Sequence, residues 1–258
     1  MTVLSIVSCN ERPKKGETTG EVSEKIGATS KEDETNKADI LISEAIQAHG
    51  GKLYDHAFYG FTFRNKPFTF HNENGNYTYT LTETDNNNTL IYTLKNGKFN
   101  HTLNGQETEL SQKQVAKYTE DLNSVVYFAT LPHKLNDRAV NKTYQGQTKI
   151  KGKHYQVIAV NFNKEGGGID YEDEFMYWIN SETKTMDYLA YKYETNVGGV
   201  RFRSAYNPRT IDGIRFQDYI NFKAEIGTPL KDLPALYEKG ELEELSRIDT
   251  ENVINLEK

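Results

Sequence analysis

Residues 76–99 read NYTYTLTETDNNNTLIYTLKNGKF, and this stretch indicates the fold class of the chain. Tyr77, Tyr79 and Leu81 alternate with threonines, which is the period of two that places side chains on opposite faces of a strand. The pair Asn96-Gly97 follows the next apolar run and is the strongest short hairpin signal in the chain. The stretch therefore predicts part of an antiparallel meander.

Strand patterns of the same kind continue on both sides of this stretch. Upstream, Tyr59, Phe61 and Phe63 alternate with small or polar residues. The further strands that we expect cover residues 148–150, 155–162, 174–179, 185–193, 200–206 and 214–222. Several are separated by turn pairs, namely Asn104-Gly105, Lys151-Gly152 and Asp212-Gly213.

Three segments are expected to be helical. An apolar stripe between Ala38 and His49 predicts a helix that begins near Ala38 and is ended by Gly50-Gly51. Ser111 and Gln114 have the spacing of a capping box in front of a second helical face. The acidic tail from residue 230 to 258 is expected to be helical around residues 233–245.

Two of the later strands carry large apolar side chains at both parities. Residues 175–179 read FMYWI, and residues 186–191 read MDYLAY. A strand with one solvated face would alternate cleanly between apolar and polar residues. We therefore expect a mainly β, α+β fold in which helices cover one face of the sheet, while the other face is also covered or lines a cavity.

Composition excludes several classes of function. The formal net charge of −6 leaves no basic excess for binding a nucleic acid. No apolar run approaches the ~20 residues that a membrane-spanning helix needs. The single cysteine excludes an intramolecular disulfide and a thiolate zinc site, and the 6 histidines show no metal-ligand spacing. We expect neither a metal nor a cofactor.

A short apolar run near the N-terminus ends at Cys9. Ile6-Val7-Ser8-Cys9 resembles the lipobox of bacterial lipoproteins, in which the cysteine becomes the acylated first residue of the mature chain. The basic start of a signal peptide is missing and the apolar part is short. We interpret residues 1–9 as a truncated lipoprotein signal, with a chance cysteine in an ordinary N-terminus as the alternative.

The segment that follows Cys9 is polar. Residues 10–37 contain no aromatic residue and few apolar ones, so we expect a disordered tether that reaches roughly 30 Å. The remaining residues, 38–258, form one predicted β-rich domain with an acidic C-terminal tail. This order is that of an anchored lipoprotein, and it predicts attachment to the outer membrane of a bacterial envelope, on its periplasmic or its outer face.

The layout of the chain resembles that of LolA-like proteins. The shared features are a first helix that ends in AHGG at residues 48–51, a long meander, a helical insert, further strands and the lipobox. The resemblance implies a curved antiparallel half-barrel sheet with the N-terminal and inserted helices on one face, around an apolar cavity for acyl chains. The carriers of this type are soluble and unacylated, so an anchored acceptor or binding module fits this chain better than a shuttle.

Two sequence blocks point to a further likeness. YFATLPHKLND at residues 127–137 and DYLAYKYETNVGGVRFR at residues 187–203 resemble an uncharacterised family of bacterial envelope lipoproteins. The likeness implies no activity.

Aromatic residues are the main candidates for ligand binding. Seven of them could line an apolar concavity, although packing in the core is the alternative for each. They are Tyr77, Tyr79, Tyr92, Tyr177, Trp178, Tyr191 and Phe202.

Charged residues suggest two further sites. Arg201, Arg203 and Arg215 lie on neighbouring strands and could bind an anionic head group or a glycan carboxylate, or pair with the acidic loop at residues 165–174. The acidic residues Asp170, Glu172 and Asp173 follow three glycines and could serve an envelope hydrolase or glycan-processing enzyme. A solvated loop is the other interpretation of this cluster, whose spacing does not match a calcium loop.

The sequence favours a binding protein over an enzyme. We expect an outer-envelope lipoprotein that binds a lipid, an acyl chain or another amphipathic small molecule in an apolar concavity, and that meets the membrane through acylated Cys9. The alternatives are the hydrolase that uses the acidic cluster and a structural component of an envelope complex, for which a protein partner would cover the sheet.

Overall fold

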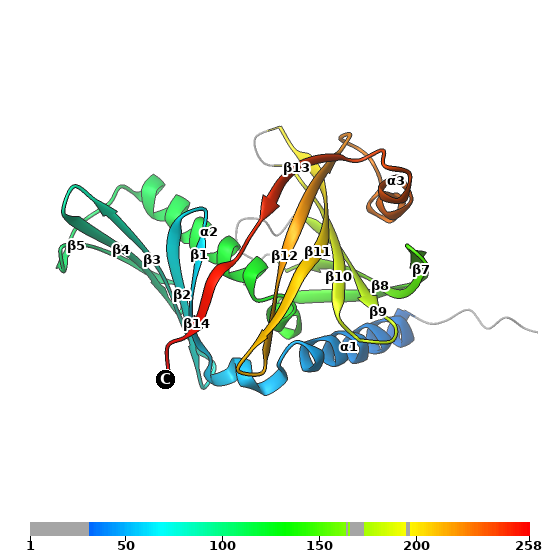
Figure 1. The fold of residues 1–258 in the computed structure, drawn as a ribbon, viewed down its shortest axis with the longest axis horizontal. Helices are drawn as coiled ribbons and strands as arrows, with labels where there is room; N and C mark the ends of the chain where they lie inside the picture. Colours follow the sequence, from blue (N-terminus) through cyan, green and yellow to red (C-terminus); the bar gives the residue numbers. More distant parts are fainter. Residues whose placement is uncertain (1–30, 164, 166–172, 195–196) are drawn as a thin grey trace, which may run out of the picture.

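The chain forms two antiparallel sheets of seven strands each in a computed structural model that describes residues 31–163, 165, 173–194 and 197–258 (Figure 1). Three of the predicted functional residues, Cys9, Asp170 and Glu172, lie outside the described residues.

The first sheet contains the predicted N-terminal meander. Its strands lie in the order β14, β1, β2, β3, β4, β5, β6. The strands β1 to β6 follow one another as hairpins, and β14, the last strand of the chain, pairs with β1 at the edge of the sheet. The bounds are β1 Phe58–Phe63, β2 Lys66–Glu73, β3 Asn76–Asp85, β4 Asn88–Lys95, β5 Lys98–Leu103, β6 Gln106–Glu107 and β14 Glu251–Asn255.

Turn chemistry explains why these hairpins form. Asn96 and Gly97 have φ values of 47° and 79°. A two-residue type I′ turn requires positive φ at both central positions, which asparagine and glycine tolerate best. Asp212 and Gly213 repeat the pattern in the second sheet, with φ values of 48° and 88°.

The second sheet is also a meander, with the strand order β13, β12, β11, β10, β9, β8, β7. The strand of this sheet that comes first in the chain is β7. It begins at Val140, whereas the sequence predicts a strand only from residue 148. The difference arises because β7 is an edge strand with mostly polar, partly exposed residues, which show no apolar alternation. The bounds are β7 Val140–Ile150, β8 Lys153–Phe162, β9 Glu174–Asn180, β10 Met186–Tyr193, β11 Gly199–Ile211, β12 Ile214–Ala224 and β13 Glu243–Ile248.

The C-terminal tail links the two sheets. The expected helix around residues 233–245 is shorter: η3, Leu230–Asp232, leads into α3, Leu233–Lys239, and the chain then turns into β13 and β14. β13 pairs with β12 of the second sheet, and β14 pairs with β1 of the first sheet. Backbone pairing with these partners overrides the local helical preference of the Glu-rich segment.

The N-terminal helix α1, Lys31–Ala48, begins earlier than the predicted start near Ala38. Acidic residues occupy its first turn, where they stabilise the positive end of the helix dipole. The predicted apolar stripe is buried against the second sheet and consists of Ala38, Leu41, Ile42 and Ala45. A 3-10 helix, η1 (Gly51–His56), leads from α1 into β1.

The inserted helix α2, Gln112–Ala129, starts with the predicted capping box. The Ser111 side chain accepts a hydrogen bond from the Gln114 backbone, and the Gln114 side chain accepts one from the Ser111 backbone. The helix crosses from the first sheet toward the second (Figure 1). The short 3-10 helix η2, His133–Asn136, connects it to β7.

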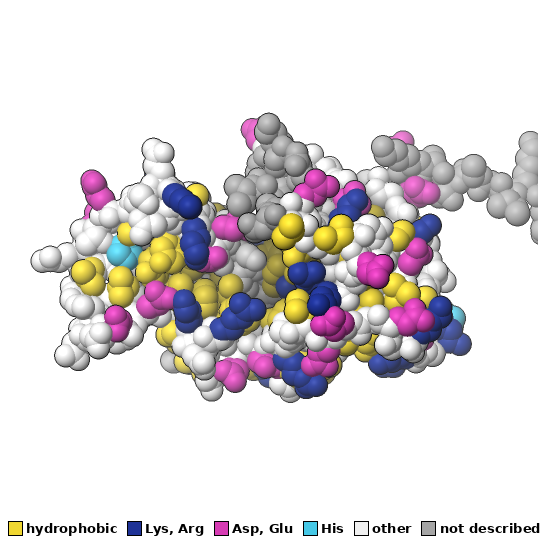
Figure 2. All heavy atoms as spheres, turned by 90° about the horizontal axis from the view of Figure 1, so that it is seen from above, with side chains coloured by type: hydrophobic (Ala, Val, Ile, Leu, Met, Phe, Trp, Pro, Cys, Tyr) yellow, Lys and Arg dark blue, Asp and Glu magenta, His cyan; other side chains and the backbone are white. Residues whose placement is uncertain are grey.

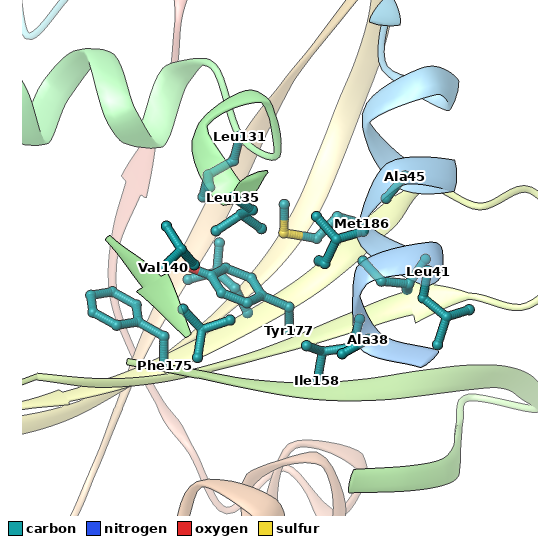
Figure 3. Packing of buried hydrophobic residues seen from close by; sticks show 14 of the residues in the cluster. Ala38, Leu41, Ala45, Leu131, Leu135, Val140, Ile158, Phe175, Tyr177 and Met186 are labelled. Atoms are coloured by element: carbon teal, nitrogen blue, oxygen red, sulfur yellow. The ribbon is translucent and has the colours of Figure 1, made fainter. Parts of the chain in front are cut away.

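Both faces of the second sheet are covered, as the apolar strands predict. Tyr177 and Leu189 belong to the inner cluster, which α1 and η2 complete. Figure 3 shows Tyr177 and Ile158 of this sheet facing side chains of α1 and η2. On the opposite face, Trp178 and Phe202 pack beneath η3 and α3 in a separate cluster.

The first sheet buries one face only. Its buried aromatic side chains, Phe61, Phe68 and Phe70 among them, form a third cluster with Leu122 and Val126 of α2. The predicted fold class is therefore confirmed: the described residues form two antiparallel sheets that do not close into a barrel, with α1 and α2 on the inner side. None of the described helices is long and apolar enough to span a membrane.

Candidate binding site

A cavity of about 310 Å³ lies between the two sheets. We call it the intersheet cavity. Its walls come from β1 of the first sheet, from α2, from β10–β12 of the second sheet, from the end of β13 and from the turn between β13 and β14. Because α2 and the C-terminal strands touch both sheets, the cavity lies where the separate parts of the fold meet.

Aromatic and aliphatic side chains make up much of the wall of the intersheet cavity. Phe61 and Phe63 come from β1, Val125 and Phe128 from α2, and Tyr191 from β10. The Phe128 and Tyr191 rings are 5.6 Å apart, so helix and sheet contact each other directly here. Figure 2 shows hydrophobic side chains gathered on one face of the molecule over the half that holds the first sheet and α2. These walls suit the apolar part of a ligand.

One side chain of this wall, Arg203, is a buried cation. It is 7% exposed and lies on β11. Its Nη2 donates a hydrogen bond to the Tyr191 hydroxyl at 2.8 Å, and its guanidinium lies 4.0 Å from the centre of the Phe128 ring. Among the described residues, Nε and Nη1 of Arg203 have no hydrogen-bond partner.

An amide lies beside this arginine. Asn221 of β12 is the register partner of Arg203 and also lines the intersheet cavity. It is 6% exposed, and its Nδ2 donates to the Ser246 hydroxyl at 3.3 Å. Its Oδ1 has no partner among the residues that the structure describes. Two residues of the cavity wall that pair across neighbouring strands thus carry buried donors and a buried acceptor without a partner among the described residues.

Two buried phenols, those of Tyr177 and Tyr219, interact electrostatically with Arg203. The Tyr127 and Tyr177 hydroxyls share a hydrogen bond of 2.7 Å. Burial raises the pKa of Tyr177 well above its usual value, and burial raises the pKa of Tyr219 to about 12. These hydroxyls are therefore neutral near pH 7, and they do not balance the charge of the arginine.

The structure divides the seven predicted aromatic residues among three places. Tyr77, Tyr79 and Tyr92 pack in the cluster of the first sheet under α2, and Tyr92 stacks on Tyr118 of α2 with ring centres 4.2 Å apart. Among the seven, Tyr191 lines the intersheet cavity, and Tyr177 lies in the inner cluster against which Tyr191 packs. Trp178 and Phe202 lie on the opposite face of the second sheet, beneath α3.

The three predicted arginines differ in their hydrogen-bond partners. Arg201 donates to the Tyr193 hydroxyl at 2.5 Å and to the Val200 carbonyl at 3.1 Å. Arg215 donates to the Gln217 side chain at 3.2 Å. Of these three arginines, only Arg203 lines the intersheet cavity, and its buried Nε and Nη1 have no hydrogen-bond partner among the described residues.

The acidic cluster is only partly visible. Asp173 directly precedes β9 and is buried, with 8% of its surface exposed. The other two predicted carboxylates, Asp170 and Glu172, lie outside the described residues. Within those described residues, no group of three or more histidine, cysteine or acidic side chains could hold a metal ion.

A second, larger hollow of about 780 Å³ lies on the outer face of the second sheet. It is bounded by β7–β9 and by residues 227–231 before α3. Its wall is rich in amide and hydroxyl side chains, such as Asn141, Thr143 and Gln147. Apolar residues such as Val157, Met176 and Trp178 also line it, but its wall comes from the second sheet and the segment before α3 and does not join the two sheets.

Several wall residues escaped prediction from the sequence. Phe128 lies in an apolar run at the end of α2, where periodicity does not show which neighbour faces which sheet. Asn221 carries no local signal, because only its pairing with Arg203 on the adjacent strand brings it to the cavity. Phe61 and Phe63 are visible as strand residues, but the sequence does not show that their strand faces α2.

Comparisons with known proteins place the chain in a family. Residues 33–250 match the model of a family described as "Family of unknown function (DUF6503)". The chain belongs to this family. No curated protein matches it. Because the function of the DUF6503 family is unknown, the likeness to LolA-like proteins remains a resemblance of layout.

Three solved structures of bacterial proteins are similar to this DUF6503 member at low identity. A DUF1329 family protein from Desulfovibrio piger has 11% identity and a TM-score of 0.46, and the match covers 86% of this chain and 93% of that one. A LolA superfamily protein from Nitrosomonas europaea has 11% identity and a TM-score of 0.49, with 84% and 92% covered. A domain from Vibrio parahaemolyticus named for outer membrane lipoprotein sorting has 8% identity and a TM-score of 0.44, with 85% and 93% covered. None of these similarities assigns a ligand to the chain.

Proposed function

We propose that this protein binds a lipid, a free acyl chain or another amphipathic small molecule in the intersheet cavity. The observation that carries the proposal is the cavity itself, whose wall is contributed by both sheets and α2 and includes Phe61, Phe63, Val125 and Phe128. Acylated Cys9 would add membrane attachment, so that the binding domain would act at the envelope surface.

The volume of the cavity limits how much apolar ligand surface can be buried, and therefore how much free energy apolar contact can contribute to binding. A volume of about 310 Å³ is at the lower end of the range for ligand pockets. Burial of roughly 200 Å² of apolar ligand surface would contribute about 5 kcal/mol. Association itself costs at least about 4 kcal/mol in lost freedom, so apolar contact alone gives a weak complex. A polar contact at one end of the cavity would raise the affinity.

Filling the cavity tests the proposal. Ser124 of α2 lines the intersheet cavity and is partly buried, so Ser124→Phe should occupy ligand space without replacing a core residue. We expect this variant to lose at least about ten-fold in affinity for a fluorescent fatty-acid probe, because the ring removes contact area. Probe fluorescence is titrated in parallel for the wild type.

The matched control is Ser124→Ala, which leaves the cavity open and should bind the probe like the wild type. Unchanged uptake by Ser124→Phe would show that the probe binds elsewhere, and the intersheet cavity would then not be the binding site.

A further inference from the structure

Arg203 lacks the partners that a structural arginine has. Its Nε and Nη1 have no hydrogen-bond partner among the described residues, although the side chain is 93% buried, given its exposed fraction of 7%. The carboxylate that lines the same cavity, that of Asp121, forms its ion pair with Lys117 at 2.5 Å and not with Arg203. Burying a charge without a counterion is strongly unfavourable, so such an arrangement calls for a function.

Arg209 shows what a structural arginine looks like in the same sheet. It donates to the Asp218 carboxylate at 3.1 Å, to the Asn207 carbonyl at 3.0 Å and to the Thr250 carbonyl. Its charge is balanced by a carboxylate that is itself buried. Arg209 thus has hydrogen-bond acceptors and a counterion, whereas the Nε and Nη1 groups of Arg203 have no such partners among the described residues.

The guanidinium of Arg203 is held in place without being neutralised. Stacking on Phe128 fixes one face of the group, and the hydrogen bond to Tyr191 fixes Nη2. All three residues line the intersheet cavity. A cation that is buried and already held in position binds an anion more strongly than a solvated cation does. Less water has to be removed from it, and its side chain does not have to be ordered on binding.

Asn221 extends this polar end. It faces Arg203 across the β11–β12 ladder, and its free Oδ1 can accept a hydrogen bond. An anionic head group that also carries a hydroxyl or another donor would satisfy both residues. Phe61 and Phe63 lie on the other sheet, across the cavity, and would contact the apolar part of the same ligand.

We propose that Arg203 receives the negatively charged head group of the ligand, so that the intersheet cavity selects anionic amphiphiles, such as long-chain carboxylates, over neutral ones. This inference rests on the proposed function, because it names the chemical class of ligand for the same cavity. Arg203 supplies the charge, and Asn221 accepts a hydrogen bond from the head group.

The test compares three ligands on the full-length wild type by isothermal titration calorimetry: dodecanoate below its micellar concentration, dodecanol and acetate. Hydrogen bonds to a charged group make dodecanoate bind at least about ten-fold more tightly than dodecanol. Equal affinities for dodecanoate and dodecanol would overturn the role of Arg203 while leaving the proposed function intact. Failure of both long-chain ligands to bind would instead contradict the proposed function. Acetate binding as tightly as dodecanoate would show a site for small free anions, and it would overturn the inference.

Two variants of Arg203 test whether this side chain causes the preference for dodecanoate over dodecanol. Arg203→Met should lose at least about ten-fold in affinity for dodecanoate and keep its affinity for dodecanol. Arg203→Lys keeps the charge and should retain a preference for dodecanoate. Full binding of dodecanoate by Arg203→Met would overturn the proposal, and so would loss of the preference for dodecanoate in Arg203→Lys.

The matched control for these variants is Arg247→Met. Arg247 lies on β13, is exposed and pairs with Glu244 at 3.2 Å. Its removal takes away one positive charge without touching the cavity wall, so dodecanoate affinity should not change. An equal loss in Arg247→Met and Arg203→Met would indicate long-range attraction rather than a contact, which would contradict the inference.

Discussion

At the scale of single residues, His49 at the end of α1 shows how burial constrains a titratable group. Its ring is fully buried, and Nε2 accepts a hydrogen bond from the Met186 backbone at 3.1 Å. Burial, helped by the nearby charge of Arg215, lowers the pKa of His49 to about 3. The fold therefore requires the neutral ring, because Nε2 must stay an acceptor.

The prediction that follows concerns stability in acid. The pKa of a histidine in the unfolded chain is about 6.5, so between pH 6.5 and pH 3 the unfolded state binds the extra proton and the folded state does not. We therefore expect the proton uptake of His49 to lower the free energy of unfolding by about 2 kcal/mol when the pH falls from 7 to 5. Urea unfolding at both pH values measures the change.

The variant His49→Gln isolates this contribution, since its amide oxygen can accept the same hydrogen bond but does not titrate. It should lose less stability than the wild type over the same pH interval. Parallel losses in both proteins would mean that His49 takes up no proton on unfolding in this range.

At the scale of elements, the carboxylate of Asp218 holds the turn between β13 and β14 against the second sheet through hydrogen bonds. Asp218 of β12 is 3% exposed and accepts hydrogen bonds from the Asn207 side chain at 2.6 Å and from the Thr250 backbone at 2.8 Å. Arg209 balances its charge. Because β13 and β14 belong to different sheets, this carboxylate stabilises the connection between them.

Removing this carboxylate should be strongly destabilising. Asp218→Ala leaves buried donors and a partly buried cation without a partner, which we expect to lower the unfolding free energy by about 3 kcal/mol. Glu243→Ala is the control, because the exposed pair of Glu243 with Lys223 is worth less than about 1 kcal/mol. Chemical denaturation of both variants measures the difference. Equal, small losses would show that the turn does not depend on Asp218.

The elements also show how far the sequence predicts the fold. Period-two patterns and Asn-Gly turns predict the meanders, since both signals are local. The helix α1 and the capping box of α2 follow from local spacing in the same way. β13 and β14 are missed because their Glu-rich residues become strands only through pairing with β12 and β1, partners that are distant in the chain.

The candidate site is less predictable than the fold for the same reason. Arg203 and Tyr191 are among the residues predicted from composition and strand parity, and they do line one cavity. The sequence does not distinguish Arg203 from Arg201, because two residues on one face of a strand look alike until their partners are known. In the structure, Arg201 has the Tyr193 hydroxyl and a carbonyl, and Arg203 keeps free donors.

At the scale of the whole molecule, the two sheets meet in two ways. Phe216 of β12 packs against Tyr59 and Phe70 of the first sheet in a shared core, and beside this core lies the intersheet cavity. The second sheet is buried on both faces, whereas the first sheet buries only its inner face. α2 and the C-terminal strands bridge the gap, and the intersheet cavity lies between them with a buried, unneutralised cation in its wall. An anionic amphiphile would fill this space and balance that charge at once.

Native mass spectrometry of the full-length protein, purified from bacterial cells and compared before and after solvent extraction, tests this account most directly. We predict an additional mass of a small amphiphile that is lost on extraction and replaced when dodecanoate is added. A protein that carries no additional mass and takes up no dodecanoate would contradict the claim that the intersheet cavity is a binding site.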